Sequence, residues 1–398
     1  SPVRGRVVLI HEEAEQMTRS LLLRWRRVAA LTRKELLQLR RDKIMLFFIL
    51  YAFSFNIYIS GTGMGMQLEH AKLGVRDLDR TETSRELISR FQEPYFTKVP
   101  VEDPRLAEEQ LDQGQLMMLL EIPPDFQTSL KRGLGGELLL QIDTTNSVLG
   151  LLGYGYSAQI VQNYGMELAL SDMHQTVEAL ENLPTIKQES RVWYNPNQND
   201  SWFISLSEML NMITLLAILL PASAMAREKE RGTIEQLLVT PLSTVEIMLP
   251  KILSMVVVVL GGTTFTLFFM INGVFGLPMR GSLLFFYLVT TLHVLTTSGL
   301  GLLLATVARN LSQVAMLTLV TFVPMLLLSG VWTPPEAMPW WMRLLTQLSP
   351  LHHYVETSFG ILLKGATPQM LAPSCLYLVV LGTAILGVGT SRFRRQFD

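Results

Sequence analysis

The run MLNMITLLAILLPASAMA, residues 209–226, carries no charged side chain, and REKERGTIEQLLVTP, residues 227–241, follows it with six charges. A helix of about 20 apolar residues is long enough to cross about 30 Å of hydrocarbon. The junction therefore predicts a helix that reaches a membrane surface at residue 226 and continues into a charged segment beside that surface.

The same kind of run recurs along the 398-residue chain. Uncharged runs cover residues 44–68, 209–226, 252–279, 281–308, 310–335 and 365–391. Hydrophobic residues make up 49% of the chain, charged residues 17%, and the mean hydropathy is +0.30, which excludes a soluble enzyme. The runs are also too long for the strands of a membrane barrel, which have about ten residues. We predict an α-helical polytopic membrane protein with six transmembrane helices.

Basic residues predict the orientation, because Lys and Arg are enriched in cytoplasmic loops. Residues 1–43 hold eleven Lys or Arg against five acids, residues 227–251 hold four more, and the tail 392–398 is basic. Residues 62–201 instead carry 21 acids against 11 bases. Both termini are therefore predicted to be cytoplasmic and residues 62–201 to lie outside. The first run follows a long polar lead, so we expect a retained anchor and not a cleaved signal peptide.

These assignments give a domain layout. It consists of a cytoplasmic tail with an amphipathic interfacial helix (1–43), the first transmembrane helix (44–61), an extracytoplasmic α/β domain (62–201), transmembrane helices two to six (202–391) and a cytoplasmic tail (392–398). Within the fourth part, residues 333–364 are broken by prolines and too short to cross, so we predict an outer re-entrant segment.

The inserted segment 62–201 alternates strand and helix signals. Strands are predicted at 71–77, 116–122 and 137–143, and helices at 82–91, 104–113, 125–131 and 147–182. The segment has neither a glycine-rich phosphate loop nor paired carboxylates in a catalytic setting. We therefore interpret it as a binding or gating module.

Residues 21–43 are predicted to form a basic amphipathic helix on the inner membrane surface. One arc holds Leu21, Trp25, Val28, Leu36 and Leu39, and the other side holds Arg26, Arg27, Arg33, Lys34, Arg40 and Arg41. The helix either anchors in the headgroup region with no other task or contacts a cytoplasmic partner.

Residues 227–241 carry the signals of a short helix at the cytoplasmic surface. Thr233 to Gln236 form a capping box and Thr240-Pro241 stops the helix, while Ser243 to Glu246 form the capping box of the next one. These signals alone leave two readings open, a charged turn that only fixes the topology and a helix that docks on a partner.

A resemblance favours the docking helix. Glu228-Lys229-Glu230-Arg231-Gly232-Thr233, with Glu235, Leu237-Leu238, Thr240-Pro241, Glu246 and Lys251, resembles the coupling-helix signature of ABC-2 type exporter permeases. Lys34-Glu35 through Arg41-Asp42 resembles the interfacial helix of that family, Asn195-Pro196 the entry to its second span, and Ser329 to Leu351 the loop before its last span. The large domain after the first span resembles the multidrug-type subgroup of bacterial inner-membrane permeases.

The resemblance implies a half-transporter in the bacterial inner membrane that works as a homo- or heterodimer. The chain has no Gly-Lys dipeptide and hence no P-loop, so an ABC ATPase subunit would supply the ATP and Mg chemistry and this chain would bind no cofactor. The resemblance leaves open whether a periplasmic adaptor takes part, and it implies no nucleic-acid partner. The implied ATPase-coupling residues are Arg227, Glu228, Glu230, Arg231, Gly232, Thr233, Glu235, Leu237 and Leu238, and those of the interfacial helix are Arg33, Lys34, Glu35, Arg41 and Asp42.

The substrate implied is hydrophobic or amphipathic, drug-like or lipid-like. In the family the second and fifth spans line the cavity, so the implied wall positions are Asn211, Met212, Leu215, Met316, Thr321, Met325 and Leu328. Methionine-rich faces repack around varied guests, although ordinary packing between spans explains the same residues. Hydroxyls near His293 in the fourth span are expected to serve helix contacts.

Other classes of function remain as alternatives. A membrane sensor or mechanotransmission protein would bind a ligand or partner through residues 62–201 without transport. An intramembrane enzyme would need two polar catalytic residues at the same depth in the membrane. The spans offer only scattered polar residues such as His293. The lone Cys375 excludes an intramolecular disulfide. Because none of the six histidines was found in an i, i+4 ligand spacing with a carboxylate nearby, no metal site is predicted.

Overall fold

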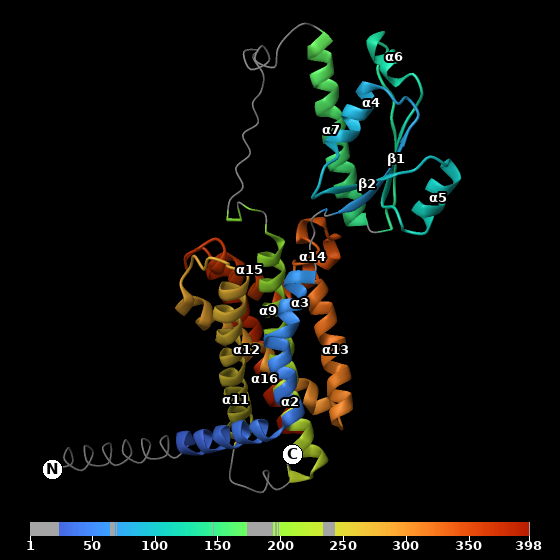
Figure 1. The fold of residues 1–398 in the computed structure, drawn as a ribbon. Helices are drawn as coiled ribbons and strands as arrows, with labels where there is room; N and C mark the ends of the chain where they lie inside the picture. Colours follow the sequence, from blue (N-terminus) through green and yellow to red (C-terminus); the bar gives the residue numbers. More distant parts are fainter. Residues whose placement is uncertain are drawn as a thin grey trace, which may run out of the picture. The chain divides into compact units, whose positions relative to one another are not determined.

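The fold is described from a computed structural model, which covers residues 24–63, 68, 70–145, 147–172, 194–195, 197, 199–233 and 243–397. The chain divides into two compact units, one formed by residues 1–64 and 193–398 and the other by residues 65–192. Figure 1 shows a helical unit and a mixed unit with a small sheet.

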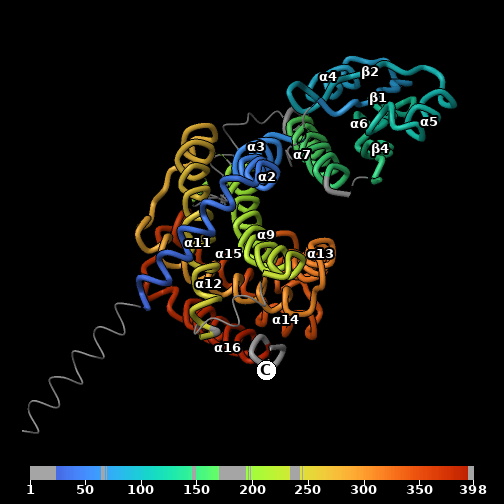
Figure 2. The backbone as a smooth tube through the Cα atoms, turned by 90° about the horizontal axis from the view of Figure 1, so that it is seen from below, coloured from blue at the N-terminus to red at the C-terminus, as the bar shows by residue number. Residues whose placement is uncertain are grey.

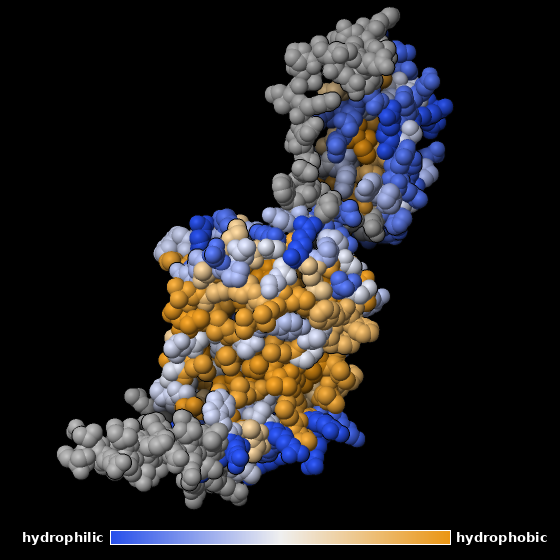
Figure 3. Space-filling model, turned by 90° about the vertical axis from the view of Figure 1, so that its left-hand side faces the viewer, coloured by the Kyte–Doolittle hydropathy of each residue, from blue (hydrophilic) through white to orange (hydrophobic). Residues whose placement is uncertain are grey.

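The helical unit begins with a helix at residues 24–41, which we call the interfacial helix. Its long apolar helices are α2 (Lys43–Phe53) with α3 (Phe55–Gly63), α9 (Asp200–Glu230), α11 (Thr244–Phe265) with the π-helix η1 (Thr266–Val274), α12 (Leu283–Val307), α13 (Leu311–Leu327) and α16 (Ala372–Phe397). Five of these segments are long and apolar enough to cross a membrane. Figure 3 shows the apolar belt that they form, with hydrophilic residues gathered beyond it.

These five segments match five of the six predicted spans. The predicted fifth span is the apolar helix α13, which has 17 residues and so lies at the short end of the lengths that cross a bilayer. Its status as a sixth span therefore stays a prediction. The first span is not one continuous helix, because the backbone departs from helical geometry at Ser54, between α2 and α3.

Helix α9 packs against α3, α11, α12 and α13 (Figure 2). Its contact with α12 is close, because a side chain at Gly301 of α12 would overlap the carbonyl oxygen of Ile218 on α9. Small residues at such crossings let two helix backbones approach each other. Helices α9 and α12 together therefore form the centre of the helical unit, with α11, α13, α15 and α16 packed around them.

The hydroxyls of α12 bond mainly within their own helix, and the predicted contacts with neighbouring helices are made by Thr290 and by Thr296, whose Oγ1 lies 3.4 Å from Leu378 O of α16. Thr290, Thr296 and Thr297 each donate to the carbonyl four residues earlier, and Thr290 also meets the Tyr354 hydroxyl at 3.1 Å. His293 is fully buried, lies 2.8 Å from Thr214 Oγ1 and stacks on Tyr354. This arrangement joins α9, α12 and α15 (Pro350–Leu362) and contains no carboxylate.

The predicted re-entrant segment 333–364 forms short elements separated by prolines. They are the turn η2 (Pro335–Ala337), α14 (Trp340–Gln347) and α15. Helix α15 is mostly buried and packs against α9, α12 and α16, whereas Trp340 and Trp341 on α14 are exposed. The segment thus adds a packed layer to one end of the helical unit.

The second unit is built on a four-stranded sheet in the order β2-β1-β3-β4. Its strands are β1 (Ala71–Asp77), β2 (Phe96–Pro100), β3 (Met118–Ile122) and β4 (Leu139–Ile142), and only the β3–β4 pair is antiparallel. Its helices are α4 (Glu82–Arg90), α5 (Pro104–Asp112), α6 (Phe126–Lys131) and α7 (Ser147–Asp172). The α/β composition predicted from sequence is confirmed, and the predicted elements begin within a few residues of the observed ones, while the end predicted for the helix 147–182 lies outside the described residues.

Alternation along β3 explains how both faces of the sheet are covered. Met118, Leu120 and Ile122 join the core that includes residues of α4 and α7, whereas Leu119 packs with Ala107 of α5 on the other face. Strand β2 was not predicted, because it is short and ends at Pro100. It lies at the edge of the sheet, which is where a strand tolerates proline.

Candidate functional site

Four charged residues form a closed ring at the end of the helical unit that carries residues 227–233. Lys34 Nζ lies 2.9 Å from Glu228 Oε1 and 3.4 Å from Glu35 Oε1, and Lys251 Nζ lies 2.8 Å from Glu228 Oε2 and 2.9 Å from Glu35 Oε1. Positive and negative groups therefore alternate around the ring. We call these four residues the ion ring.

The ion ring joins three separate elements. Lys34 and Glu35 come from the interfacial helix, Glu228 from α9 and Lys251 from α11. The side chains of Glu35, Glu228 and Lys251 are only 6%, 4% and 2% exposed, while that of Lys34 is 48% exposed. A cavity of only about 10 Å³ remains beside them, which is at the lower limit for a single water. The charges are thus stabilised by one another and not by solvent.

Burial makes every member of the ring depend on its neighbours. Removing one partner of a buried ion pair costs about 3–5 kcal/mol, because it leaves an uncompensated charge. Partial burial lowers the pKa of Lys34, but hydrogen-bond and Coulomb contact with Glu228, and then with Glu35, outweighs it and raises that pKa above its ordinary value. Lys34 therefore stays protonated throughout the neutral range and the ring stays closed.

The predicted role of the interfacial helix needs a correction. Lys34 is exposed like Arg33 and Arg41, but its ammonium is held by Glu228 within the protein and does not only face the surroundings. Val28 and Leu39 are buried against protein, while Trp25 is 63% exposed, so the apolar arc does not face the acyl boundary as a whole. Burial of Glu35 explains the difference, since an ionised carboxylate at this depth must be paired.

Residues 227–230 reach four neighbouring parts of the unit. Arg227 pairs with Asp42 at 3.1 Å, and Asp42 in turn caps the first turn of α2 through Met45 N. Lys229 Nζ donates to the carbonyls of Ala305, Thr306 and Ala308 at the end of α12, and Glu230 accepts from Leu311 N at the start of α13. Successive side chains of a helix point in different directions. This end of α9 is therefore bonded to α2, α11, α12 and α13 at once.

Lys229→Met is expected to destabilise the protein by about 1–2 kcal/mol. Its ammonium satisfies the terminal carbonyls of α12 and complements the negative end of that helix. Thermal unfolding in detergent measures the loss, and Lys229→Arg, which keeps the charge, serves as the control. Equal unfolding temperatures for wild type and Lys229→Met would show that the cap contributes nothing.

A left-handed glycine ends α9. Gly232 has φ +65°, and its N–H donates to Lys229 O, which is the usual way that a helix C-terminus is closed. Arg231 and Gly232 are exposed, and Thr233 Oγ1 lies 3.3 Å from Glu228 O. Glu235, Leu237 and Leu238 lie outside the described residues. The capping box at Ser243 and Glu246 is confirmed, with Glu246 N 3.3 Å from Ser243 Oγ.

The structure therefore unites part of the predicted coupling set. Lys34, Glu35 and Glu228 meet in the ring, Arg227 meets Asp42, and Arg33 and Arg41 remain exposed apart from it. Lys251 is the ring member that was not among the predicted site residues. Its sequence signal is a lysine directly after Pro250, at the border of the third uncharged run.

The predicted substrate-pathway residues lie on two helices that pack against each other, α9 and α13. Asn211 and Met325 are buried and Met316 is 66% exposed, while the others, Met212, Leu215, Thr321 and Leu328, are half-buried. Asn211 approaches Glu208, which also accepts from Asn56 of α3 at 2.5 Å, and Asn211 Oδ1 is buried without a hydrogen-bond partner. Their role in a pathway stays a prediction.

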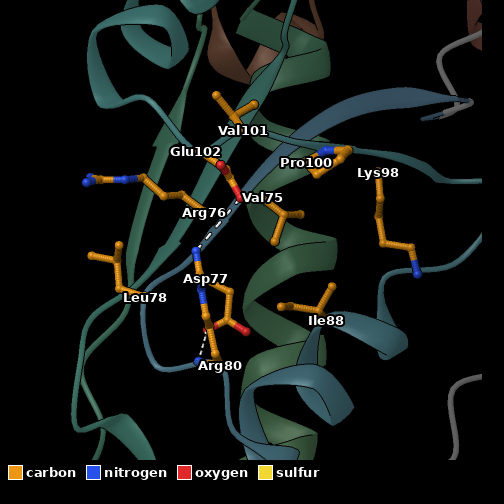
Figure 4. A pocket seen from close by; sticks show the side chains of 10 residues that line it. All are labelled: Val75, Arg76, Asp77, Leu78, Arg80, Ile88, Lys98, Pro100, Val101 and Glu102. Atoms are coloured by element: carbon orange, nitrogen blue, oxygen red, sulfur yellow. Dashed lines mark hydrogen bonds and ion pairs between the residues drawn. The ribbon is translucent and has the colours of Figure 1, made fainter.

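The second unit holds a pocket of about 310 Å³ beside β1 and β2 (Figure 4). Charged residues of both signs line it, including Arg76, Asp77, Lys98 and Glu102, together with Val75 and Ile88. Arg80 crosses it through an ion pair of 3.8 Å with Glu102. The pocket is compatible with the predicted binding module but selects no ligand class.

The sequence of the chain is similar to a known family of membrane proteins. Residues 44–390 match the model of the ABC-2 family transporter proteins. The chain is 32% identical over 362 residues to the inner membrane transport permease YhhJ of Escherichia coli K12, covering 91% of this chain and 95% of that one. It is 30% identical over 376 residues to the probable multidrug ABC transporter permease YbhR of the same strain, covering 93% and 99%. The chain belongs to the ABC-2 family of transporter proteins.

Proposed function

We propose that this chain is the permease subunit of an ABC exporter and moves a hydrophobic or amphipathic substrate outward across a bacterial inner membrane. A separate ABC ATPase chain hydrolyses ATP, and a second permease subunit completes the assembly. Both termini and residues 227–241 lie on the cytoplasmic side, and residues 65–192 lie on the other side. The basic composition of residues 1–43 and 227–251 supports this orientation.

The ion ring is the observation that carries the proposal. A charged segment that only fixed the topology would keep its charged side chains in water, because no desolvation free energy is then lost. Here Glu228 is 3% exposed and is held by lysines from two other elements. Such a junction transmits a push on residues 231–241 into the interfacial helix, α9 and α11 together. This is what an ATPase docked below the membrane requires of its permease.

ATP-driven closure of the ATPase pair would then shift the balance between two packings of the permease. The driving force enters at the end of α9 and spreads through Arg227, Lys229 and Glu230 to α2, α12 and α13. The substrate would pass near the α9–α13 contact. Met212 and Met325 belong to that region, and thioether side chains adapt to guests of different shape.

The test is to purify the tagged chain from its own host in mild detergent, after crosslinking in the native membrane, and to identify co-purifying proteins by mass spectrometry. We expect an ATP-binding cassette protein and ATPase activity that apolar compounds stimulate. A chain that repeatedly purifies without any ATPase would overturn the proposal in favour of the membrane sensor. Substrate uptake into inverted vesicles distinguishes the two readings independently.

A further inference from the structure

The outer layer of the helical unit contains three metal-ligating side chains that the proposed transport function does not use. His352, His353 and Glu356 of α15 each offer one ligand atom, and these atoms lie within 4.8 Å of one another. His352 and Glu356 are four residues apart, a spacing that the sequence reading overlooked. A cavity of about 550 Å³ adjoins them, lined also by Ser329, Gln347 and Ser374.

Both imidazoles are oriented as metal ligands usually are. Each ring nitrogen that faces a backbone carbonyl must carry the proton, so His352 Nδ1 donates to Ser329 O and His353 Nε2 donates to Gln347 O, both at 3.0 Å. The opposite nitrogens, Nε2 of His352 and Nδ1 of His353, then bear lone pairs. This is the arrangement in which a protein fixes the tautomer of a metal-binding histidine.

His353 provides an independent observation, which is a buried ring nitrogen that is left unpaired. The residue is 2% exposed, and among the described residues its Nδ1 has no hydrogen-bond partner. Buried acceptors nearly always have a partner, because leaving one unpaired costs about 1–3 kcal/mol. The ring is held in place by stacking on Tyr377 of α16, with centroids 4.8 Å apart.

The carboxylate of Glu356 is the third metal-ligating group beside the two imidazoles. Glu356 is exposed, and its Oε2 accepts from Ser374 Oγ of α16 at 2.9 Å, which orients the group as a second-shell hydroxyl does at metal sites. The one nearby cation, Arg343, donates to the carbonyls of Pro335, Glu336 and Met338 and so is occupied elsewhere. No Arg or Lys pairs with Glu356 among the described residues.

We propose that His352, His353 and Glu356 bind a divalent transition-metal ion, with zinc as the best match, at the outer end of the helical unit. Two imidazoles and one carboxylate are a zinc donor set that leaves a fourth position for water. Bonds of about 2.1 Å at tetrahedral angles place ligand atoms about 3.4 Å apart. The exposed Glu356 side chain can turn toward the imidazoles, and small shifts of α15 that keep both imidazole hydrogen bonds would shorten the remaining separation, which is at most 4.8 Å. The bound ion would tie α15 to α16 and to the residues that follow α13.

The test uses the full-length chain in detergent, purified through a tag without histidine and stripped with a chelator. Zinc is titrated by calorimetry, bound metal is counted by mass spectrometry after desalting, and cobalt replaces zinc to show ligand-field bands in the visible spectrum. We expect one zinc per chain for wild type and for His70→Gln, a control that removes a histidine from the other unit.

Three variants decide the outcome. Glu356→Gln, which keeps an acceptor for Ser374, is expected to weaken binding more than tenfold, and Ser374→Ala about tenfold as a second-shell change. The double variant His352→Ala/His353→Ala is expected to lose saturable binding and the cobalt bands. Absence of stoichiometric zinc in wild type, or unchanged affinity in folded Glu356→Gln, would overturn the proposal. Unfolding temperature and gel filtration verify that each variant is folded.

Discussion

Lys251→Met is expected to lower the free energy of unfolding by about 3–5 kcal/mol. Like Lys34, Lys251 contacts both Glu35 and Glu228 through its ammonium, but it is the buried lysine of the two, with a side chain that is 2% exposed. Removing its charge leaves two buried carboxylates that share only the half-exposed Lys34. Methionine fills a volume similar to that of lysine, so the lost stability comes from removing the charge and not from creating a cavity. Thermal unfolding in detergent, monitored by gel filtration of heated samples, measures it.

A double variant separates the ring from a general packing defect. Adding Glu228→Gln to Lys251→Met removes one anion with the cation and leaves the Lys34–Glu35 pair, so the double variant is expected to be more stable than Lys251→Met alone. The exposed Lys43 at the start of α2 gives the control, since Lys43→Met should change stability by no more than about 0.5 kcal/mol. Additive losses in the double variant would show that the four charges do not act as a ring.

Glu228→Gln is expected to uncouple transport from ATP hydrolysis. The amide keeps the shape of the side chain but loses the charge that holds Lys34 and Lys251 to the end of α9. Loss of a coupling free energy of about 1–3 kcal/mol lowers substrate-stimulated ATPase activity about 5- to 150-fold. Because Glu228 is buried, Glu228→Lys would place three cations around Glu35 and unfold the ring.

The control for uncoupling is Glu246→Gln at the same end of the helical unit. Glu246 closes the capping box of α11, and glutamine serves equally well at that position. We expect its stimulated activity to stay within about twofold of wild type, close to the precision of such assays. If Glu228→Gln kept wild-type stimulation while remaining folded, the ion ring would have no part in coupling.

Much of the fold follows from local sequence signals. Uncharged runs end where the chain leaves the membrane, so they locate the long helices. Capping residues such as Ser243 locate the first residues of helices. Alternating strand and helix signals likewise located all strands of the second unit except β2, whose Pro100 hides it. These signals succeed because each acts within a few residues of the chain.

The candidate sites depend on tertiary contacts that sequence patterns do not contain. Lys34 and Glu228 are 194 positions apart, and helical periodicity assigned Lys34 to a headgroup-facing side. Lys251 belongs to the sequence signature of the coupling segment, but only the tertiary structure shows that α11 places its ammonium between two carboxylates. Similarly, the state of His353 is set by Gln347 and Tyr377, which belong to other helices.

The central claim is that an ATPase chain docks against the end of α9, and crosslinking tests it most directly. The only native cysteine is replaced by Cys375→Ala, and a single cysteine is then introduced as Arg231→Cys or, at the other end of the helical unit, as Lys364→Cys. Both positions are exposed basic residues. A thiol-to-amine crosslinker in native membranes is predicted to join the ATP-binding cassette protein to the Arg231→Cys chain only. Equal crosslinking of both positions, or none at Arg231→Cys, would contradict the account.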